Sequence, residues 1–122
     1  MLINLTNHPL DTWEENQKKI AESIYNKIVD LPFPIIPPDE GLDYVQKLSD
    51  EYLEKIEALL KNANYENNAV HLMGELTFTY VLLNKLREKG IQAVASTTKR
   101  NVIEIQEGKL SRFSFVRFRD YY

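Results

Sequence analysis

Short apolar segments alternate with longer amphipathic ones along most of the chain, and this alternation constrains the fold more than any other feature. The short segments cover residues 1–5, 27–31, 69–73 and 91–95. Between them, apolar residues recur at helical spacing from a cap at Asp11 or Thr12 to about Ile24, from 42 to 61 and from 76 to 89. Strands and helices that alternate in this way build βαβ units, in which helices cover a parallel sheet. We therefore expect an α/β fold.

The end of the chain has a different pattern. Residues 102–106 and 113–119 are two strand-like runs joined around Gly108, which predicts an antiparallel hairpin at one edge of the sheet. No internal repeat or break in composition divides the 122 residues, so we expect a single domain, residues 1–122. The predicted fold is a Rossmann-like, mostly parallel sheet with about four parallel strands, a C-terminal antiparallel hairpin and helices on both faces.

The composition excludes several classes of site. The chain has no cysteine, which rules out a disulfide framework, a thiolate metal site and a cysteine nucleophile. It has only two histidines and no glycine-rich dinucleotide loop, so neither a metal nor a cofactor is expected. The net charge of −3 argues against a surface that coats long nucleic acid. The sequence shows no signal peptide and no apolar stretch long enough to span a membrane, so we expect a cytoplasmic protein.

Polar residues gather where the predicted strands end. In open parallel sheets, ligands bind beyond the carboxyl ends of the strands, near the point where the strand order reverses. Four segments are expected to meet there, namely residues 6–8, 32–34, 74–77 and 96–100. The last segment offers three hydroxyls, two cations and a run of backbone amides, which suits a phosphate group if the segment bends into a loop. Alternatively, it is a polar turn with an exposed Lys-Arg pair.

Several single residues in these segments have both a functional and a structural interpretation. Glu75 either binds a ribose hydroxyl, acts as a base, or complements the dipole of the helix that begins beside it. Gly74 would let a ligand approach the backbone closely. His8 is either a general acid, a hydrogen-bond donor to a phosphate, or the cap of a turn beside Pro9. Phe33, between two prolines, is a candidate for stacking on a base, whereas His71 is expected to be a hydrogen-bonded core residue.

Three of these features resemble the CRISPR-associated Rossmann-fold (CARF) domains, and more narrowly the small stand-alone ring nucleases of CARF-like fold. They are the polar turn at residues 6–8, the helix start at Gly74 and Glu75, and the hydroxyl-rich basic segment at residues 96–100. Members of that family often carry Asp or Asn ahead of the last segment, where this chain has Ala95. The resemblance would cover nearly the whole chain.

The resemblance implies a function and a set of site residues. In that family, two subunits build one symmetric pocket for a cyclic oligoadenylate, a second messenger of CRISPR antiviral signalling, and ring nucleases cleave it. We therefore expect a homodimer that binds this small nucleotide and, if it is an enzyme, cleaves it by metal-independent phosphodiesterase-type chemistry. The catalytic candidates are Lys99, Arg100, His8 and Glu75, and the ligand-binding candidates are Thr6, Asn7, Phe33, Gly74, Thr77, Ser96, Thr97 and Thr98.

Two other functions remain open at this point. One is a nucleoside-processing enzyme of deoxyribosyltransferase type, with Glu75 as the nucleophile. The other is a non-catalytic module that senses a nucleotide, or that binds a partner through the aromatic and basic strand at residues 113–122. Only the cyclic oligoadenylate hypothesis requires Lys99 and Arg100 to recognise a multiply charged ring.

Overall fold

The computed structural model describes all residues, 1–122, as one five-stranded sheet with three α-helices. The strands are β1 (Leu2–Thr6), β2 (Ile28–Asp30), β3 (Ala69–Met73), β4 (Ala93–Ile105) and β5 (Gly108–Asp120), in the spatial order β2-β1-β3-β4-β5. The strands β1 to β4 are parallel, and β5 runs antiparallel to β4. The expected α/β class, the mostly parallel sheet and the C-terminal antiparallel hairpin are therefore confirmed.

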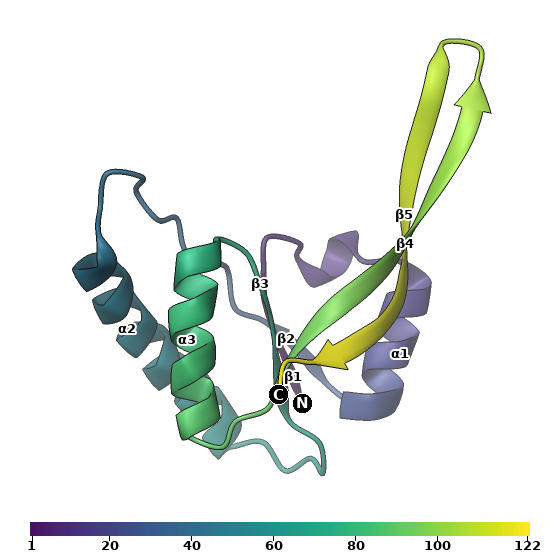
Figure 1. The fold of residues 1–122 in the computed structure, drawn as a ribbon. Helices are drawn as coiled ribbons and strands as arrows, with labels where there is room; N and C mark the ends of the chain where they lie inside the picture. The colour runs from purple at the N-terminus through teal and green to yellow at the C-terminus, as the bar shows by residue number, and fades with distance from the viewer.

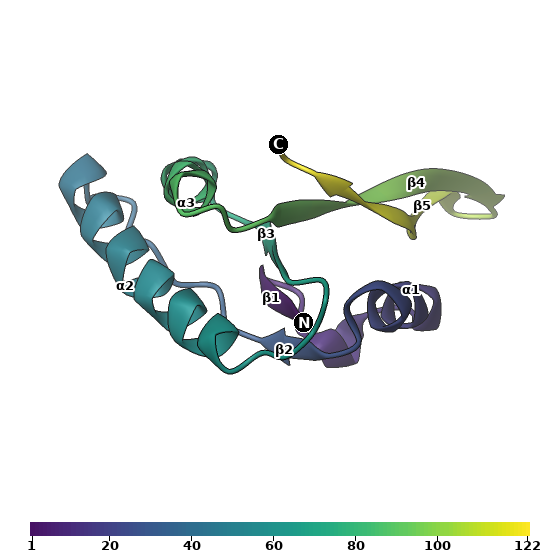
Figure 2. The same cartoon turned by 90° about the horizontal axis from the view of Figure 1, so that it is seen from below.

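The helices are α1 (Glu15–Tyr25), α2 (Leu42–Lys61) and α3 (Leu76–Glu88), and a short 3-10 turn, η1 (Leu10–Thr12), follows β1. Figure 2 shows α1 on one side of the sheet and the pair α2 and α3 on the other. The first helix begins later than the sequence predicts, because residues 10–12 form η1 and Trp13 has an extended backbone. After α3, Gly90 adopts the left-handed conformation, with φ of +69°, that the predicted C-terminal glycine requires. None of the helices has the length and apolar character needed to cross a membrane.

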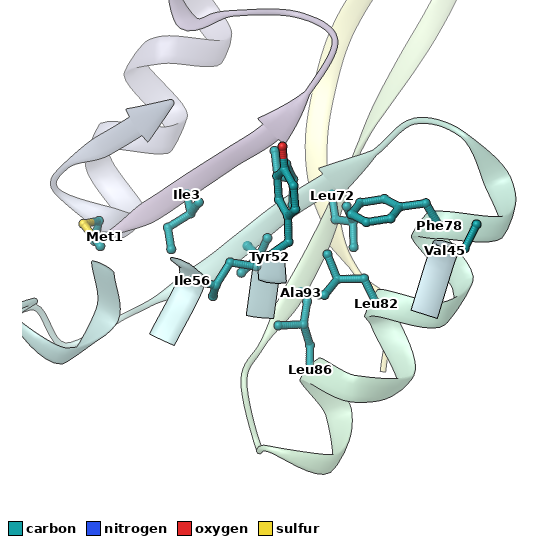
Figure 3. Packing of buried hydrophobic residues seen from close by; sticks show 12 residues of the cluster. Met1, Ile3, Val45, Tyr52, Ile56, Leu72, Phe78, Leu82, Leu86 and Ala93 are labelled. Carbon is teal, nitrogen blue, oxygen red and sulfur yellow. The ribbon is translucent and has the colours of Figure 1, made fainter. Parts of the chain in front are cut away.

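The larger hydrophobic core lies between the sheet and the pair α2 and α3. It contains Met1, Ile3, Leu5, Val45, Tyr52, Ile56, Val70, Leu72, Phe78, Leu82, Leu86 and Ala93 (Figure 3). The sequence predicts that α3 is apolar and buried almost all round. In the structure Leu76 is 82% exposed and Tyr80 is 69% exposed, so only the face of α3 turned towards α2 and the sheet is buried.

A smaller core lies between the sheet and α1. It contains Leu2, Trp13, Ala21, Tyr25, Ala69, Val94, Phe115 and Phe118. Because successive side chains of a strand point to opposite faces, β1 directs Ile3 and Leu5 towards α2 and α3. The same alternation places Asn4 and Thr6 on the α1 side of the sheet, where the apolar core gives way to polar residues.

The C-terminal hairpin differs most from the prediction. The sequence predicts a loop at residues 96–100, between a fourth strand and a separate hairpin. Instead, β4 pairs with β5 from Val94 to Ile105, with a bulge between Thr97 and Thr98 as the only irregularity. The hydrogen bonds between β4 and β5 use backbone amides of residues 96–100, and a phosphate-binding loop would need such amides to be free. As a result, the two strands project together beyond the body of the protein (Figure 1).

Gly74, between β3 and α3, lies at a close contact within the fold. A Cβ atom at this position would lie 2.3 Å from two carbon atoms of the Phe33 ring. The ring is half-buried and packs edge-on against Phe78, with ring centroids 5.3 Å apart. The predicted close approach to Gly74 is therefore made by the Phe33 ring of the same chain.

We predict that Gly74→Ala destabilises the fold by roughly 1–3 kcal/mol, because the new methyl group forces the Phe33 ring out of its packed position. Urea unfolding measures the change. Gly41→Ala is the matched control, since a Cβ atom there meets nothing within 4 Å. Adding Phe33→Leu to Gly74→Ala should recover part of the loss, and strictly additive losses would contradict the account.

Candidate functional site

A cavity of about 580 Å³ opens at the carboxyl ends of β1 and β3, on the α1 side of the sheet. This is the end of a parallel sheet at which ligands of open α/β proteins bind. Its volume lies within the range of small-molecule sites. The lining residues are Thr6, Asn7, His8, Thr12, Trp13, Glu14, Gln17, His71, Met73, Gly74, Ser96, Thr98, Phe113 and Phe115.

The turn after β1 forms one wall of the cavity, and its shape is fixed by hydrogen bonds to one carbonyl group. The His8 carbonyl oxygen accepts from Asn4 Nδ2 at 2.9 Å, Thr6 Oγ1 at 3.2 Å and Trp13 Nε1 at 3.0 Å. The His8 amide in turn donates to Thr6 Oγ1 at 3.1 Å. With its backbone held in this way, His8 presents an exposed imidazole ring at the cavity.

A hydrogen-bond chain runs beneath the cavity from the exposed Asp30 through the buried Asn4 to the buried His71. Asn4 Nδ2 donates to Asp30 Oδ1 at 2.8 Å, and Asn4 Oδ1 lies 3.1 Å from His71 Nδ1. Because the amide group of Asn4 donates to two acceptors, its orientation is fixed and its oxygen can only accept. His71 must therefore carry its proton on Nδ1, which leaves Nε2 as a hydrogen-bond acceptor.

His71 is 2% exposed and its Nε2 atom has no hydrogen-bond partner in the protein. Trp13 and Phe118 pack edge-on against the imidazole ring, each with a centroid distance of 5.4 Å. Burial and, to a lesser extent, the charge of His8 lower the pKa of His71 from 6.5 to about 4. The ring is thus neutral at neutral pH, which confirms the predicted buried and hydrogen-bonded core histidine.

The remaining walls combine aromatic rings with hydroxyl groups. Trp13 and Phe115 are buried, whereas Phe113 is 61% exposed at the base of the projecting hairpin. Ser96 and Thr98 bring hydroxyl groups from β4, and the Ser96 hydroxyl contacts Met73 Sδ at 3.2 Å. Aromatic faces next to hydroxyl, amide and imidazole groups suit a ligand that has both a flat apolar part and polar edges.

Six of the residues predicted for the site line this cavity: Thr6, Asn7, His8, Gly74, Ser96 and Thr98. Phe33 lines a separate, smaller hollow together with Asp30 and Pro32. Glu75 and Thr77 line a third hollow, beside the N-terminus of α2.

Glu75 is the N-cap of α3. Its carboxylate accepts from the backbone amides of Thr77 and Phe78, at 2.9 Å and 3.1 Å, and also from the Thr77 hydroxyl. These hydrogen bonds lower the pKa of Glu75, with the bond from the Thr77 side chain as the largest cause. The structure therefore gives Glu75 the structural role considered for it, at a helix N-terminus outside the main cavity.

The two cations predicted for the site lie on opposite faces of the hairpin. Directly paired residues of an antiparallel ladder project from the same face. Arg100 pairs with Phe113, which lines the cavity, so Arg100 lies on the cavity side of the hairpin. Lys99, one residue away, projects from the other face. No Lys or Arg is among the cavity-lining residues, and Arg100 donates from Nη2 to Ser111 Oγ at 2.9 Å.

Thr97 also lies on the face opposite the cavity. Its hydroxyl accepts from the Arg117 amide at 3.3 Å, beside the bulge in the hairpin. No group of three or more His, Cys, Asp or Glu side chains is placed to hold a metal ion.

Sequence reasoning missed the buried polar chain and most of the aromatic lining. His71 was detectable as the one polar residue of an otherwise apolar strand, and Asn4 as a polar residue between two apolar ones. Their positions also pair directly in the register of β1 and β3. Trp13 and Phe115 gave no such signal, because a core aromatic residue and one that lines a cavity have the same sequence pattern.

Comparison with known proteins identifies one matching family. Residues 1–119 match the family described as "Uncharacterized protein MJ1673 family". A curated relative, "Uncharacterized protein MJ1673" of Methanocaldococcus jannaschii, is 33% identical over 108 residues, which cover 84% of this chain and 79% of the relative. No solved structure matches significantly.

The buried neutral His71 predicts a defined pH dependence of stability. The unfolded chain binds a proton below pH 6.5 that folded His71 does not accept until about pH 4. The stability that His71 contributes is therefore complete above pH 6.5 and falls as the pH drops towards 4, by on the order of 3 kcal/mol.

Urea unfolding of the wild type and of His71→Gln between pH 7 and pH 4 tests this, because the other titrating groups cancel in the difference. The wild type should lose stability relative to the variant as the pH falls. A difference in stability that does not change with pH would show that His71 is not held neutral by burial.

Proposed function

The chain belongs to the uncharacterized protein MJ1673 family, and we propose that it binds a cyclic oligoadenylate and cleaves it without a metal, as a homodimer of CARF-like, Rossmann-like domains. The observation that carries the proposal is the cavity at the carboxyl ends of β1 and β3, with aromatic walls and polar edges. An adenine ring fits the aromatic walls, and a ribose fits the hydroxyl and imidazole groups.

The sheet order supports a Rossmann-like domain of the doubly wound type. In the order β2-β1-β3-β4-β5, the chain moves outward from β1 to β2 and then crosses back to β3 on the other side. The strand order therefore reverses between β1 and β3, which is where such folds bind nucleotides. Thr6 and Asn7 follow β1, Met73 and Gly74 follow β3, and all four line the cavity.

The size of the cavity favours a dimer. About 580 Å³ is enough for one nucleoside unit, whereas a ring of several adenylates needs further surface. A second subunit supplies an equivalent cavity, and a two-fold axis matches the symmetry of a cyclic oligoadenylate.

The proposed reaction requires a positioned ribose more than a strong protein nucleophile. The 2′-hydroxyl oxygen attacks the adjacent phosphorus, which forms the P–O2′ bond and breaks the P–O5′ bond. The 2′ proton is released to a base and the 5′ oxygen takes up a proton. The products are a 5′-hydroxyl and a 2′,3′-cyclic phosphate on a linear chain. Holding the ribose in line with the phosphate supplies much of the rate acceleration.

Different residues at the cavity have different proposed roles in proton transfer and phosphate binding. The exposed imidazole of His8 serves as the proton donor to the 5′ oxygen. The hydroxyls of Ser96 and Thr98 bind the phosphate at the base of the hairpin, whereas Arg100 lies further along the same face and does not line the cavity. Lys99 projects from the other face and takes no part in this arrangement.

Incubation of the purified protein with cyclic tetra- and hexa-adenylate, without added metal, followed by chromatography of the products tests the proposal. We expect linear products from the wild type. His8→Ala should slow the cleavage by about a hundredfold or more, because it removes a general acid, while binding is retained.

Binding is tested separately with Phe113→Ala, which removes an exposed aromatic wall of the cavity. We expect affinity for the ring to fall about tenfold, the typical effect of losing one stacked base. Val116→Ala is the matched control, because Val116 is half-exposed on the same strand and does not line the cavity. An uncut ring that binds would contradict the cleavage reaction alone. Absence of both binding and cleavage would contradict the whole proposal.

A further inference from the structure

The outer part of the C-terminal hairpin, residues 98–113 of β4 and β5, forms an arm that contacts little of its own chain. Every residue of this arm is exposed, and both strands extend away from the helices and from the rest of the sheet (Figure 1). Several of the exposed residues are large and apolar, namely Val102, Ile103, Ile105, Leu110 and Phe113. An isolated two-stranded hairpin is marginally stable in water, so an arm with this composition favours a partner.

The arm has a free edge on β4. β3 pairs with β4 only at Val70 with Ala93 and at His71 with Val94, so the outer side of β4 has no neighbouring strand further along the arm. A long exposed edge of this kind is a template for pairing with another strand. The other edge, on β5, is engaged below the arm, where the carboxylate of Glu14, the N-cap of α1, accepts from the Phe115 amide at 3.3 Å.

The charges along β4 are arranged for pairing with a copy of the same strand. Between residues 99 and 105, Arg100 and Glu104 are equally distant from Val102 and project from the same face. Two such strands that run antiparallel with Val102 opposite Val102 place Arg100 of each chain opposite Glu104 of the other. Opposite charges directly across a sheet are stabilising, and the symmetry produces two such pairs.

The strand β5 offers no comparable arrangement. From Lys109 to Arg119 its charged residues are all cations, so antiparallel pairing of two β5 strands brings like charges together or leaves the charges unmatched.

We propose that the β4 edges of two copies pair antiparallel about Val102, so that the two arms form one four-stranded sheet across the dimer. Arg100 keeps donors for this contact, since only two of its five N–H groups meet Ser111. The two-fold axis stands perpendicular to the shared sheet. The two cavities, each next to Thr98 at the base of an arm, therefore face the same side of it. This interface stands on the arm alone and does not require the proposed ligand or reaction.

Sedimentation of the purified full chain without ligand, over a range of concentrations, measures the interface. We expect a species of twice the 14.3 kDa chain mass. Arg100→Glu should weaken the dimer at least about tenfold, because it creates two like-charge pairs across the interface. Glu104→Arg creates the same two pairs and also faces Lys109 of its own hairpin, so it should weaken the dimer at least as much. The double variant Arg100→Glu/Glu104→Arg should restore dimerisation. Arg112→Glu, on the β5 strand, is the control that should leave the dimer intact.

Hydrogen exchange keeps the inference testable if a charge reversal distorts the arm. Amides of residues 99–105 should gain protection as the protein concentration rises, whereas amides of residues 109–114 should not. A monomer at all concentrations, or a dimer that neither charge reversal weakens and that protects β5 instead of β4, would overturn the proposal. A monomer at all concentrations would also contradict the homodimer of the proposed function, whereas nucleotide binding by a single cavity is measured separately with Phe113→Ala.

Discussion

The hydrogen-bond chain from Asp30 through Asn4 to His71 is the constraint on which the site depends. It places Asn4 and His71 between apolar neighbours in the middle of β1 and β3, at a position where Trp13 and Phe118 pack against the His71 ring. Burying polar groups of this kind costs free energy unless they form hydrogen bonds. The hydrogen bonds of Asn4 and His71 therefore fix the orientations of these two side chains. Because Asn4 also donates to the His8 carbonyl, the same network holds the turn that forms one wall of the cavity.

The two faces of the sheet consequently have different roles. The face towards α2 and α3 is filled by apolar side chains and supplies most of the core. The face towards α1 has a smaller core, which ends at His71 and leaves the cavity beyond it. The projecting hairpin completes this cavity with Phe113 and Thr98 at its base and then continues as an exposed arm. The candidate ligand site and the candidate dimer contact thus adjoin one another along β4.

Much of the fold was predictable because hydrophobic periodicity follows directly from the geometry of strands and helices. The helix at residues 42–61 and the strand at residues 69–73 have the predicted bounds. The hairpin was predicted only in part, since hydroxyl and basic residues at 96–100 are compatible with either a loop or an exposed strand, and pairing with a distant strand decided between them. Glu75 could not be assigned from sequence, because a helix cap and a catalytic carboxylate have the same local pattern. The cavity depends on side chains from five separate segments, which no local pattern brings together.

Fluorescence of Trp13 tests the central claim most directly, because it is the only tryptophan of the chain and it lines the cavity. A titration with cyclic tetra- and hexa-adenylate should change its emission in a saturable way. The change should weaken in Phe113→Ala and persist in Val116→Ala. Emission that stays unchanged at all concentrations of both rings, in a protein shown to be folded, would contradict the assignment of this cavity as the nucleotide site.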